Sequence, residues 1–430
     1  MLRMLGLTVL ALATACAGTS TRQVSVEAET TVTAESTTTT TEAPDCASTL
    51  PTSAQASQLL MVMVDDPHHA AEALAAGEVG GFGLKGNQRS DVDEAISEVT
   101  ADTPLPATVA VDEEGGPVQR LRYSAGRIPS ASETADGSVE EAASTMAEHA
   151  SRMADIGVTM NFAPVADLEN EAVLSGRTYS DDPDTVAMYA SAVADATAAA
   201  GITPVVKHWP GIGGADTDPH EELPVLDDVA QLRAHDMRAF DAVIEAAPVA
   251  VMVAHAEVPG LTAPGEPVSL SRDAITGELR GSSGFDGVVI TDSLGMGAIV
   301  NQQTQADAAV AAIAAGADIA LLSGADVVAD AHQRVITAIE DGEIPGDQVE
   351  QSVRRVLAMK GIEGECFDAI SAYAAIDRTR AEQDATSGEA TEDGTDDTTG
   401  SDDPADSSGE GITDSGINDP TSDTGSGTGD

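Results

Sequence analysis

Eight short apolar runs, each ending at polar or glycine residues, recur through the middle of this 430-residue chain. Because the runs are continuously apolar and rich in β-branched residues, we expect buried strands that are covered on both faces. The eight expected strands are Leu59–Val64, Val79–Leu84, Ala107–Val111, Val158–Val165, Thr203–Val206, Val249–Ala254, Gly287–Thr291 and Ala317–Leu322.

Alanine-rich segments with helical spacing lie between these runs. The clearest of them are Val139–Ala154, Thr185–Ala200, Val229–Glu245, Gln305–Ala315 and Val327–Asp341. Eight β-then-α steps in one unit predict an α/β fold, a single (β/α)8 barrel of the TIM type. An open doubly wound sheet is the alternative that the pattern leaves.

The two ends of the chain lack this pattern. Residues 1–16 place Arg3 before a short apolar run, which predicts a secretory signal. Its last residues, Ala13–Cys16, resemble a bacterial lipobox, which implies lipidation at Cys16 and a lipid-anchored protein on the outer face of the membrane. An ordinary signal peptide with a coincidental cysteine, and hence secretion, is the alternative.

Two polar segments complete the organisation. Residues 17–45 are mainly Thr, Ser, Ala and Glu, and predict a disordered tether. Residues 381–430 contain 15 acidic residues and no Lys or Arg, and predict a disordered acidic tail. One folded domain is therefore expected over residues 46–376.

The charge balance excludes one class of partner. The chain has 73 acidic and 20 basic side chains, a net charge of −53, and ten aromatic residues. Nucleic acid phosphates would be repelled, and few aromatic rings are available to stack on bases.

Cys46 and Cys366 lie almost at the two limits of the expected domain. In an exported protein they can pair, because the ends of a domain often lie close in space. We therefore hypothesise a disulfide bond between them; two free thiols are the alternative.

Polar residues stand at or just past the ends of six expected strands. Barrel enzymes collect their chemistry at the carboxyl ends of strands, so these side chains should converge on one pocket. They are Asp65, Asp112, Asp167, the pair Lys207 and His208, His255 and Asp292.

The most specific stretch is KHWPGIGGADTDPH, residues 207–220, a glycine-rich loop that follows an expected strand. It places Asp218 two residues before His220. A carboxylate that contacts an imidazole fixes its tautomer and raises its proton affinity, which suits a general acid and base. For an isolated Asp-x-His, a polar surface loop is the ordinary interpretation.

This stretch resembles the signature of family-3 glycoside hydrolases, in the branch of β-N-acetylhexosaminidases, and similarity covers about residues 57–362. That branch has a Lys-His pair followed by Phe or Trp, Pro and Gly, then a short glycine loop and Asp-Ser-His. Further matching blocks are Asp112–Gly116 with Arg120, Asn161–Val165 with Asp167, Gly176-Arg177, Val251–His255, Gly287–Leu294 and Ala315–Asp318.

The resemblance implies a retaining mechanism. Asp292 corresponds to the nucleophile that forms a covalent glycosyl-enzyme, His220 to the acid and base, and Asp218 to the residue that orients it. Asp112, Arg177, Lys207 and His208 correspond to residues that bind the terminal sugar, and Arg120 lies in the matching block that we assign to substrate binding.

Structural roles are expected for two neighbouring residues. Lys207 can be a buried ion-pair partner of Asp167, and His255 is expected to be a hydrogen-bonded group at a strand end. Two departures from the family pattern stand in the loop: Ile212 replaces a histidine, and Pro219 replaces the serine of the Asp-Ser-His tripeptide.

The activity implied is that of an exo-β-N-acetylhexosaminidase that removes β-linked N-acetylglucosamine from peptidoglycan fragments or chitooligosaccharides. Alternatives are another family-3 glycosidase, such as a β-glucosidase or β-xylosidase, a phosphorylase, or an inactive glycan-binding lipoprotein. No metal or organic cofactor is implied. The expected partner is a carbohydrate substrate, with contact to the membrane only through a lipid anchor, and the expected state is a monomer.

Overall fold

The computed structural model describes residues 45–168 and 174–389. The expected signal segment with Cys16, all of the tether except its last residue, and residues 390–430 of the expected tail lie outside the described residues. In the described part of the chain, no helix has the length and apolar character needed to cross a membrane.

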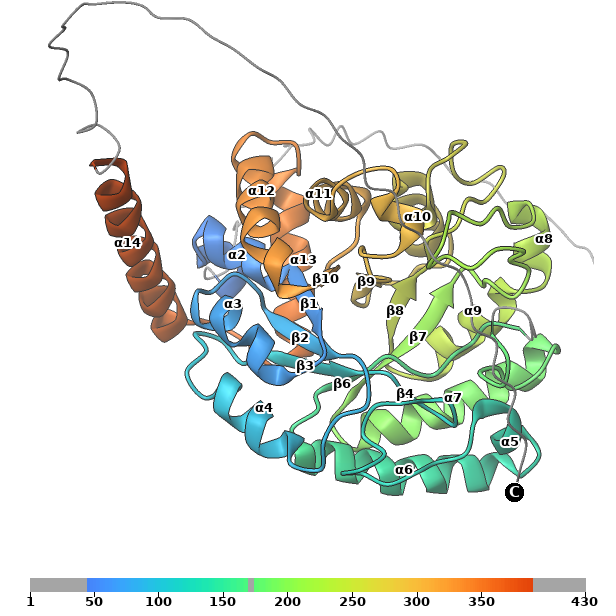
Figure 1. Ribbon diagram of the computed structural model, residues 1–430. Helices are drawn as coiled ribbons and strands as arrows, with labels where there is room; N and C mark the ends of the chain where they lie inside the picture. Colours follow the sequence, from blue (N-terminus) through green and yellow to red (C-terminus); the bar gives the residue numbers. More distant parts are fainter. Residues whose placement is uncertain (1–44, 169–173, 390–430) are drawn as a thin grey trace, which may run out of the picture. The chain divides into compact units, whose positions relative to one another are not determined.

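Eight parallel strands form the centre of the domain (Figure 1). Their order is β10-β1-β2-β3-β6-β7-β8-β9, so neighbours in the sequence are neighbours in the sheet. The backbone N–H of Thr291 donates to the carbonyl of Ile319 at 3.0 Å, which joins the two outer strands and closes the barrel. The strands are β1 (Leu60–Val64), β2 (Gly81–Leu84), β3 (Thr108–Val111), β6 (Met160–Asn161), β7 (Thr203–Trp209), β8 (Ala250–Val253), β9 (Val289–Thr291) and β10 (Ala320–Ser323).

Helices surround the strands in a ring, which Figure 1 shows from one end of the barrel. The predicted (β/α)8 barrel is confirmed. The helices are α1 (Cys46–Thr49), α2 (Thr52–Gln58), α3 (Ala71–Ala75), α4 (Val92–Thr100), α5 (Ala131–Ala135), α6 (Val139–Ile156), α7 (Pro183–Ala199), α8 (Val229–Ala234), α9 (Met237–Ala246), α10 (Gly297–Val300), α11 (Gln305–Ala315), α12 (Val328–Glu340), α13 (Gly346–Met359) and α14 (Phe367–Glu389). Short 3-10 helices lie at Pro67–Ala70, Val268–Leu270 and Ala325–Val327, and a π-helix spans Asp273–Ser282.

Long, flexible side chains fill the inside of the barrel. Met61, Met160 and Met252 are buried there together with Phe162 and Ile290. Methionine adapts to irregular space, and the interior of such a barrel is a packed core and not a pore. A second, larger apolar layer fills the space between the strands and the helices.

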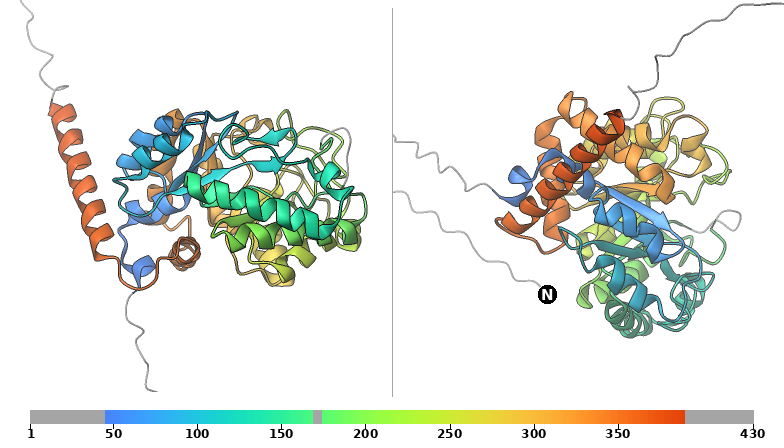
Figure 2. Two further views of the ribbon diagram at one scale, coloured as in Figure 1. Left: turned by 90° about the horizontal axis from the view of Figure 1, so that it is seen from below. Right: turned by 60° about the vertical axis from the view of Figure 1, so that its left-hand side comes forward.

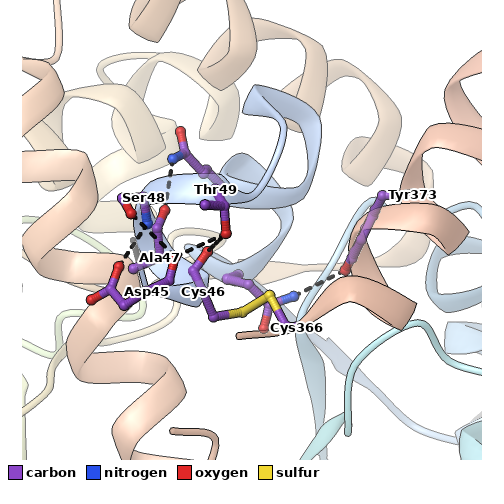
Figure 3. The surroundings of a disulfide bond; sticks show 9 residues. Asp45, Cys46, Ala47, Ser48, Thr49, Cys366 and Tyr373 are labelled. Atoms are coloured by element: carbon purple, nitrogen blue, oxygen red, sulfur yellow. Dashed lines mark hydrogen bonds between the residues drawn. A yellow bond between two sulfur atoms is a disulfide. The ribbon is translucent and has the colours of Figure 1, made fainter. Parts of the chain in front are cut away.

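The amino-terminal end of the barrel is tied together by a disulfide bond between Cys46 and Cys366 (Figure 3). The two cysteines are 320 residues apart in the sequence, and the backbone N–H of Cys46 also donates to the carbonyl of Gly364 at 2.8 Å. The predicted pairing is therefore present. It joins the start of α1, which leads into β1 through α2, to the residue that precedes α14.

Lys360, directly after α13, is half-buried at the same end of the barrel. Its Nζ donates to Oε1 of Gln58 at 2.7 Å and to the carbonyl of Gly80 at 2.8 Å. Because both acceptors are uncharged, burial dominates and lowers the pKa of Lys360 to about 7.

Several boundaries shift by one to three residues, and three elements differ more from the predictions. The strand predicted over Val158–Val165 is only Met160–Asn161, and the one predicted over Thr203–Val206 continues to Trp209. The helix predicted over Val229–Glu245 is two helices, α8 and α9, because the backbone at His235 leaves the helical region with φ −134° and ψ −81°.

The carboxyl-terminal boundary also differs. Helix α14 ends at Glu389, so it runs past the predicted domain limit at residue 376 and into the first nine residues of the segment predicted to be disordered. Tyr373 of α14 is buried, and its hydroxyl contacts Ser57 Oγ at 2.9 Å and Gln58 Nε2 at 3.1 Å. This apolar and hydrogen-bonded contact holds α14 against α2, outside the ring of barrel helices (Figure 2).

Candidate active site

A cavity of about 510 Å³ lies at the carboxyl ends of the strands. The residues predicted for catalysis and for substrate binding all line it, although they lie in or after four different strands of the barrel, β3, β6, β7 and β9. They are Asp112, Arg120, Arg177, Lys207, His208, Asp218, His220 and Asp292. The structure therefore brings together the residues assigned to catalysis and substrate binding. Three of the strand-end residues expected to converge on the pocket do not line it: Asp167 and His255 are buried behind it, and Asp65 is exposed and contacts Nδ1 of His69 at 2.8 Å.

Asp292 stands immediately after β9, in the wall of this cavity. Its Oδ1 accepts a hydrogen bond of 2.7 Å from the backbone N–H of Ser293, and 19% of its side chain is exposed. Burial alone would raise the pKa of this carboxyl group. The neighbouring rings of His208 and His255, together with the Ser293 N–H, outweigh burial and hold the pKa of Asp292 below its ordinary value. Asp292 is therefore an ionised carboxylate at neutral pH, as a nucleophile must be.

His208 lies beside Asp292 and is held from behind by Asp167. Nδ1 of His208 contacts Oδ2 of Asp167 at 2.7 Å, while Nε2 lies 4.0 Å from Oδ2 of Asp292. Asp167 is fully buried and also accepts the backbone N–H groups of His208 and Ile212. One carboxylate thus fixes both the ring of His208 and the start of the glycine-rich loop.

Lys207 is an ion-pair partner, but not of Asp167. Its Nζ contacts Oδ1 of Asp112 at 2.7 Å and Oε1 of Glu114 at 2.6 Å, and its side chain is 3% exposed. Burial lowers the pKa of Lys207, but the two carboxylates raise it further, so that the net shift is upward. The alternative pairing of Lys207 with Asp167 is not found, because the ammonium group contacts Asp112 and Glu114 while Asp167 contacts His208.

Glu114 also holds Arg177. The carboxylate accepts bonds of 2.8 Å from Nε and 2.9 Å from Nη2 of Arg177, a bidentate geometry that orients the guanidinium group. Burial would raise the pKa of Glu114, but the charges of Lys207 and Arg177 lower it to about 2. Glu114 therefore remains ionised and keeps two cationic side chains in place at the floor of the cavity.

Arg120 reaches the same cluster from a small hairpin that the sequence did not predict. This hairpin is β4 (Glu113–Gly115) paired with β5 (Val118–Gln119), and it directly follows β3. Nη2 of Arg120 lies 3.2 Å from Oδ2 of Asp112. Burial would raise the pKa of Asp112, yet Lys207 and Arg120 lower it below its ordinary value.

Glu113 points away from the cavity and anchors the hairpin. Its buried carboxylate accepts the backbone N–H groups of Arg120 and Leu121 at 2.7 and 3.0 Å, and it contacts Nε2 of His149 at 3.0 Å. The hairpin therefore places Asp112 and Glu114 on its cavity side and Glu113 on its core side, as the alternation of an extended chain requires.

The Asp218 and His220 pair stands on the loop that follows β7. Nδ1 of His220 contacts Oδ1 of Asp218 at 2.8 Å, and the side chains are 71% and 50% exposed, respectively. Burial opposes ionisation of Asp218, but the backbone N–H and the ring of His220 lower the pKa of Asp218. Because Nδ1 is engaged by a carboxylate, Nε2 is the ring atom left to exchange a proton with a bound molecule.

The two family departures have distinct surroundings. Ile212, in place of a histidine, is buried and contributes an apolar side chain to the cavity wall, while its N–H bonds to Asp167. Pro219, in place of serine, lines the cavity between Asp218 and His220. Both are thus compatible with a contact between the carboxylate and the imidazole.

His255 is a hydrogen-bonded group at a strand end, as predicted. Nδ1 contacts Oγ of Ser269 at 2.7 Å and Nε2 contacts the carbonyl of Ser293 at 3.0 Å. Burial lowers the pKa of His255, so the ring is held in its neutral form. Its place beneath Ser293 supports the turn that carries Asp292.

The described residues hold no group of three or more His, Cys, Asp or Glu side chains arranged to bind a metal ion. The carboxylates of the cavity are instead occupied by Lys, Arg and His. Together the groups form an ionised carboxylate, a proton-exchanging imidazole and a polar cluster able to bind hydroxyl and amide groups.

Comparisons with known proteins agree with this arrangement. The model of the glycosyl hydrolase family 3 N terminal domain matches residues 52–359. The beta-hexosaminidase LpqI of Mycobacterium tuberculosis is 38% identical over 325 residues, which cover 72% of this chain and 83% of that protein.

Two solved structures are also similar. A glycosyl hydrolase of the GH3 family from Mycobacterium smegmatis is 36% identical with a TM-score of 0.70, and the match covers 73% of this chain and 98% of that one. The beta-N-acetylhexosaminidase from Beutenbergia cavernae is 30% identical with a TM-score of 0.68, and the match covers 73% of this chain and 99% of that one.

Proposed function

The chain belongs to glycosyl hydrolase family 3, and from this we propose that it is a retaining exo-β-N-acetylhexosaminidase that hydrolyses terminal β-linked N-acetylglucosamine. The observation that carries the proposal is one cavity that contains both the ionised Asp292 and the paired Asp218 and His220. The printed names of the relatives, a beta-hexosaminidase and a beta-N-acetylhexosaminidase, support the same activity.

In the first step, an Oδ of Asp292 attacks the anomeric carbon of the terminal sugar, and the bond from that carbon to the leaving oxygen breaks. His220 donates its Nε2 proton to the leaving oxygen, so that the aglycone departs as a neutral alcohol. Asp218, ionised and bonded to Nδ1, stabilises the imidazolium before the proton leaves.

In the second step, water attacks the anomeric carbon of the glycosyl-Asp292 ester. His220 now accepts a proton from this water, and the Asp292 carboxylate is released. Two displacements at the same carbon restore its configuration, which makes the enzyme retaining.

The cluster of Asp112, Arg177, Lys207 and His208 would hold the terminal sugar. Asp112 can accept hydrogen bonds from neighbouring ring hydroxyls, while Arg177 and Lys207 can donate to hydroxyl oxygens or to the N-acetyl carbonyl. Glu114 contributes by holding the Arg177 and Lys207 side chains in position through its two ion pairs. His208 would line the subsite beside Asp292, with its Nε2 facing that carboxylate.

The activity is tested with 4-nitrophenyl β-glycosides of N-acetylglucosamine, glucose and xylose. We expect release from the N-acetylglucosaminide, and none above background after Asp292→Ala. Preferential release from glucose or xylose would contradict the proposal. Equal rates with and without inorganic phosphate would separate hydrolysis from phosphorolysis.

For the cellular setting, we propose an exported protein anchored through a lipid on Cys16 and acting on peptidoglycan fragments or chitooligosaccharides. The signal-like residues 1–16 and the Cys46 to Cys366 disulfide, which suits an oxidising compartment, support export. Metabolic labelling with a fatty acid should mark the wild-type protein and not Cys16→Ala. Labelling of both proteins, or of neither, would contradict the anchor.

A further inference from the structure

The loop that carries His220 is bound to the turn and helix that follow Asp292. Three successive loop carbonyls are each hydrogen-bonded by this region: Ala298 N–H donates to Pro219 at 3.1 Å, and Gly297 N–H donates to His220 at 3.0 Å. The side-chain amide of Asn301 donates to the carbonyl of Glu221 at 2.9 Å. We call Gly297, Ala298 and Asn301 the loop dock.

Gly297 is needed because the two segments touch at the backbone. A Cβ atom at this position would lie 2.2 Å from the carbonyl oxygen of Glu221 and 2.7 Å from that of His220. Real Cβ atoms do not approach so closely, and main-chain atoms cannot rotate aside. Any side chain at position 297 must therefore push the loop away.

The dock is continuous with the nucleophile. Only four residues separate Asp292 from Gly297, and this turn is fixed to the barrel by the bond from Leu294 N–H to the Leu321 carbonyl at 2.8 Å. The dock thus fixes the backbone of the acid and base loop relative to the strand end that presents Asp292. The dock bonds to the backbone of the loop, while the ring of His220 contacts Asp218.

From these contacts we infer that Gly297 and Asn301 are positioning residues for the proton-transfer step, because they set the distance between the His220 loop and Asp292. The inference rests on the proposed glycosidase function. Proton transfer requires hydrogen-bond reach between the imidazole and the leaving oxygen, and displacement by about 1 Å can cost roughly 100-fold in rate.

The leaving group distinguishes this role from a general structural one. A dinitrophenolate departs without protonation, whereas a phenolate needs the acid. We therefore expect Asn301→Ala to lower kcat/KM roughly three- to tenfold for phenyl β-N-acetylglucosaminide and less than about twofold for the 2,4-dinitrophenyl compound. Gly297→Ala should show the same preference with a larger loss, roughly 10- to 100-fold on the phenyl compound.

Gln302→Ala is the matched control. The side-chain amide of Gln302 donates to the Ala298 carbonyl at 3.0 Å. The substitution therefore removes a hydrogen bond of similar length from the same turn but none to the His220 loop. It should leave both substrates unchanged.

Hydrogen exchange measured by mass spectrometry on peptides that span residues 213–224 gives a readout that does not depend on activity. These amides should exchange faster in Asn301→Ala and in Gly297→Ala than in wild type or in Gln302→Ala. If the wild-type enzyme cleaves no N-acetylglucosaminide, the proposed function is wrong. The hydrogen-exchange measurement alone then tests whether the loop dock holds the His220 loop. Unchanged loop exchange in both variants, or equal losses on both substrates, would overturn the inference; if Gly297→Ala does not fold, Asn301→Ala decides.

Discussion

Nε2 of His208 lies 4.0 Å from Oδ2 of Asp292, and the opposite nitrogen of the ring is bonded to the buried Asp167 at 2.7 Å. The His208 ring therefore lies between the buried Asp167 carboxylate and the Asp292 carboxylate. Among the described residues, Asp167 also accepts the backbone N–H groups of His208 and Ile212, so it positions both the His208 ring and the start of the loop.

Asp167→Asn should lower kcat/KM for N-acetylglucosaminides roughly 10- to 100-fold, since a hydrogen bond to a charged group contributes about 1.5 to 3 kcal/mol. An amide keeps the shape but loses the charge that fixes the ring. Steady-state kinetics of the single and double variants with His208→Ala form the test. Because the two residues act together, the double variant should lose less transition-state stabilisation than the sum of the two single variants. A loss of kcat/KM in the double variant equal to the product of the two single losses would contradict this coupling.

Removal of the two reacting groups should have different signatures. Asp292→Ala should abolish turnover of all leaving groups. His220→Ala should lower kcat/KM by about 10² to 10⁴ for phenyl glycosides, and far less for dinitrophenyl glycosides, because only the former need a proton. A series of aryl N-acetylglucosaminides plotted against the pKa of the phenol measures this difference; parallel plots for wild type and His220→Ala would assign the acid elsewhere.

Glu114 should make stability sensitive to acid. Its pKa is about 2 in the folded protein and 4.5 ordinarily, so its stabilisation is complete above pH 4.5 and is lost as the pH falls toward 2. This corresponds to about 3 kcal/mol in total, of which about 2 kcal/mol is lost between pH 7 and pH 3. Urea unfolding at pH 7, 4.5 and 3 should show this additional decrease in wild type and not in Glu114→Gln.

Glu148→Gln, at an exposed position of α6, is the control for that comparison and should follow wild type at each pH. The same acid slope in Glu114→Gln and in wild type would show that other carboxylates cause it.

The barrel could be predicted because each buried strand coincides with a short run of apolar residues, and the spacing of these runs leaves room for a helix between successive strands. All eight strands occur where apolar runs predicted them, and errors arise where tertiary contacts decide. The β4 and β5 hairpin carries Glu113, Glu114 and Gln119, polar residues that no strand pattern selects; it is stable because the buried Glu113 carboxylate collects backbone donors. Helix α14 continues past the predicted limit at residue 376, where Asp377 accepts a hydrogen bond from Ser53 and Arg380 donates to the carbonyl of Ala76.

Sequence reasoning identified the catalytic and substrate-binding candidates that line the cavity, but it was less successful for the residues that hold those side chains in place. Glu114 was not assigned a role, although its spacing of two from Asp112 was a usable signal, since alternate residues of an extended segment face the same side. Strand order places Asp167 near both Lys207 and His208, and only the packed structure decides between them.

Lys360 should make stability rise with pH. Its pKa is about 7 when folded and 10.5 ordinarily, so the folded protein binds fewer protons than the unfolded chain between these values. The free energy of unfolding should gain about 2 kcal/mol from this residue between pH 7 and pH 9. Lys360→Met should lose that gain in urea unfolding, while Lys85→Met, a partly exposed lysine, should retain it; a wild-type curve that is flat or falls would contradict the shift.

The disulfide should stabilise the domain by constraining the unfolded chain. The double variant Cys46→Ser with Cys366→Ser should lose about 2 to 4 kcal/mol of unfolding free energy, with kcat unchanged at 25 °C because the bond is at the amino-terminal end of the barrel. Either single variant should lose a similar amount, since one cysteine alone cannot form the bond. An unchanged melting temperature would show that the bond adds no stability.

The disulfide also marks the end of the barrel at which the folded domain starts, which is opposite the cavity. Cys46 begins the helical segment that leads to the amino-terminal end of β1, whereas Asp292 and the cluster proposed to bind the sugar stand at the carboxyl ends of the strands. A support attached ahead of Asp45 is therefore on the opposite side of the barrel from the entrance to the cavity. Immobilised in this orientation, the domain would present its entrance to the surrounding liquid, and a long glycan could be trimmed from its free end without meeting the surface that holds the enzyme.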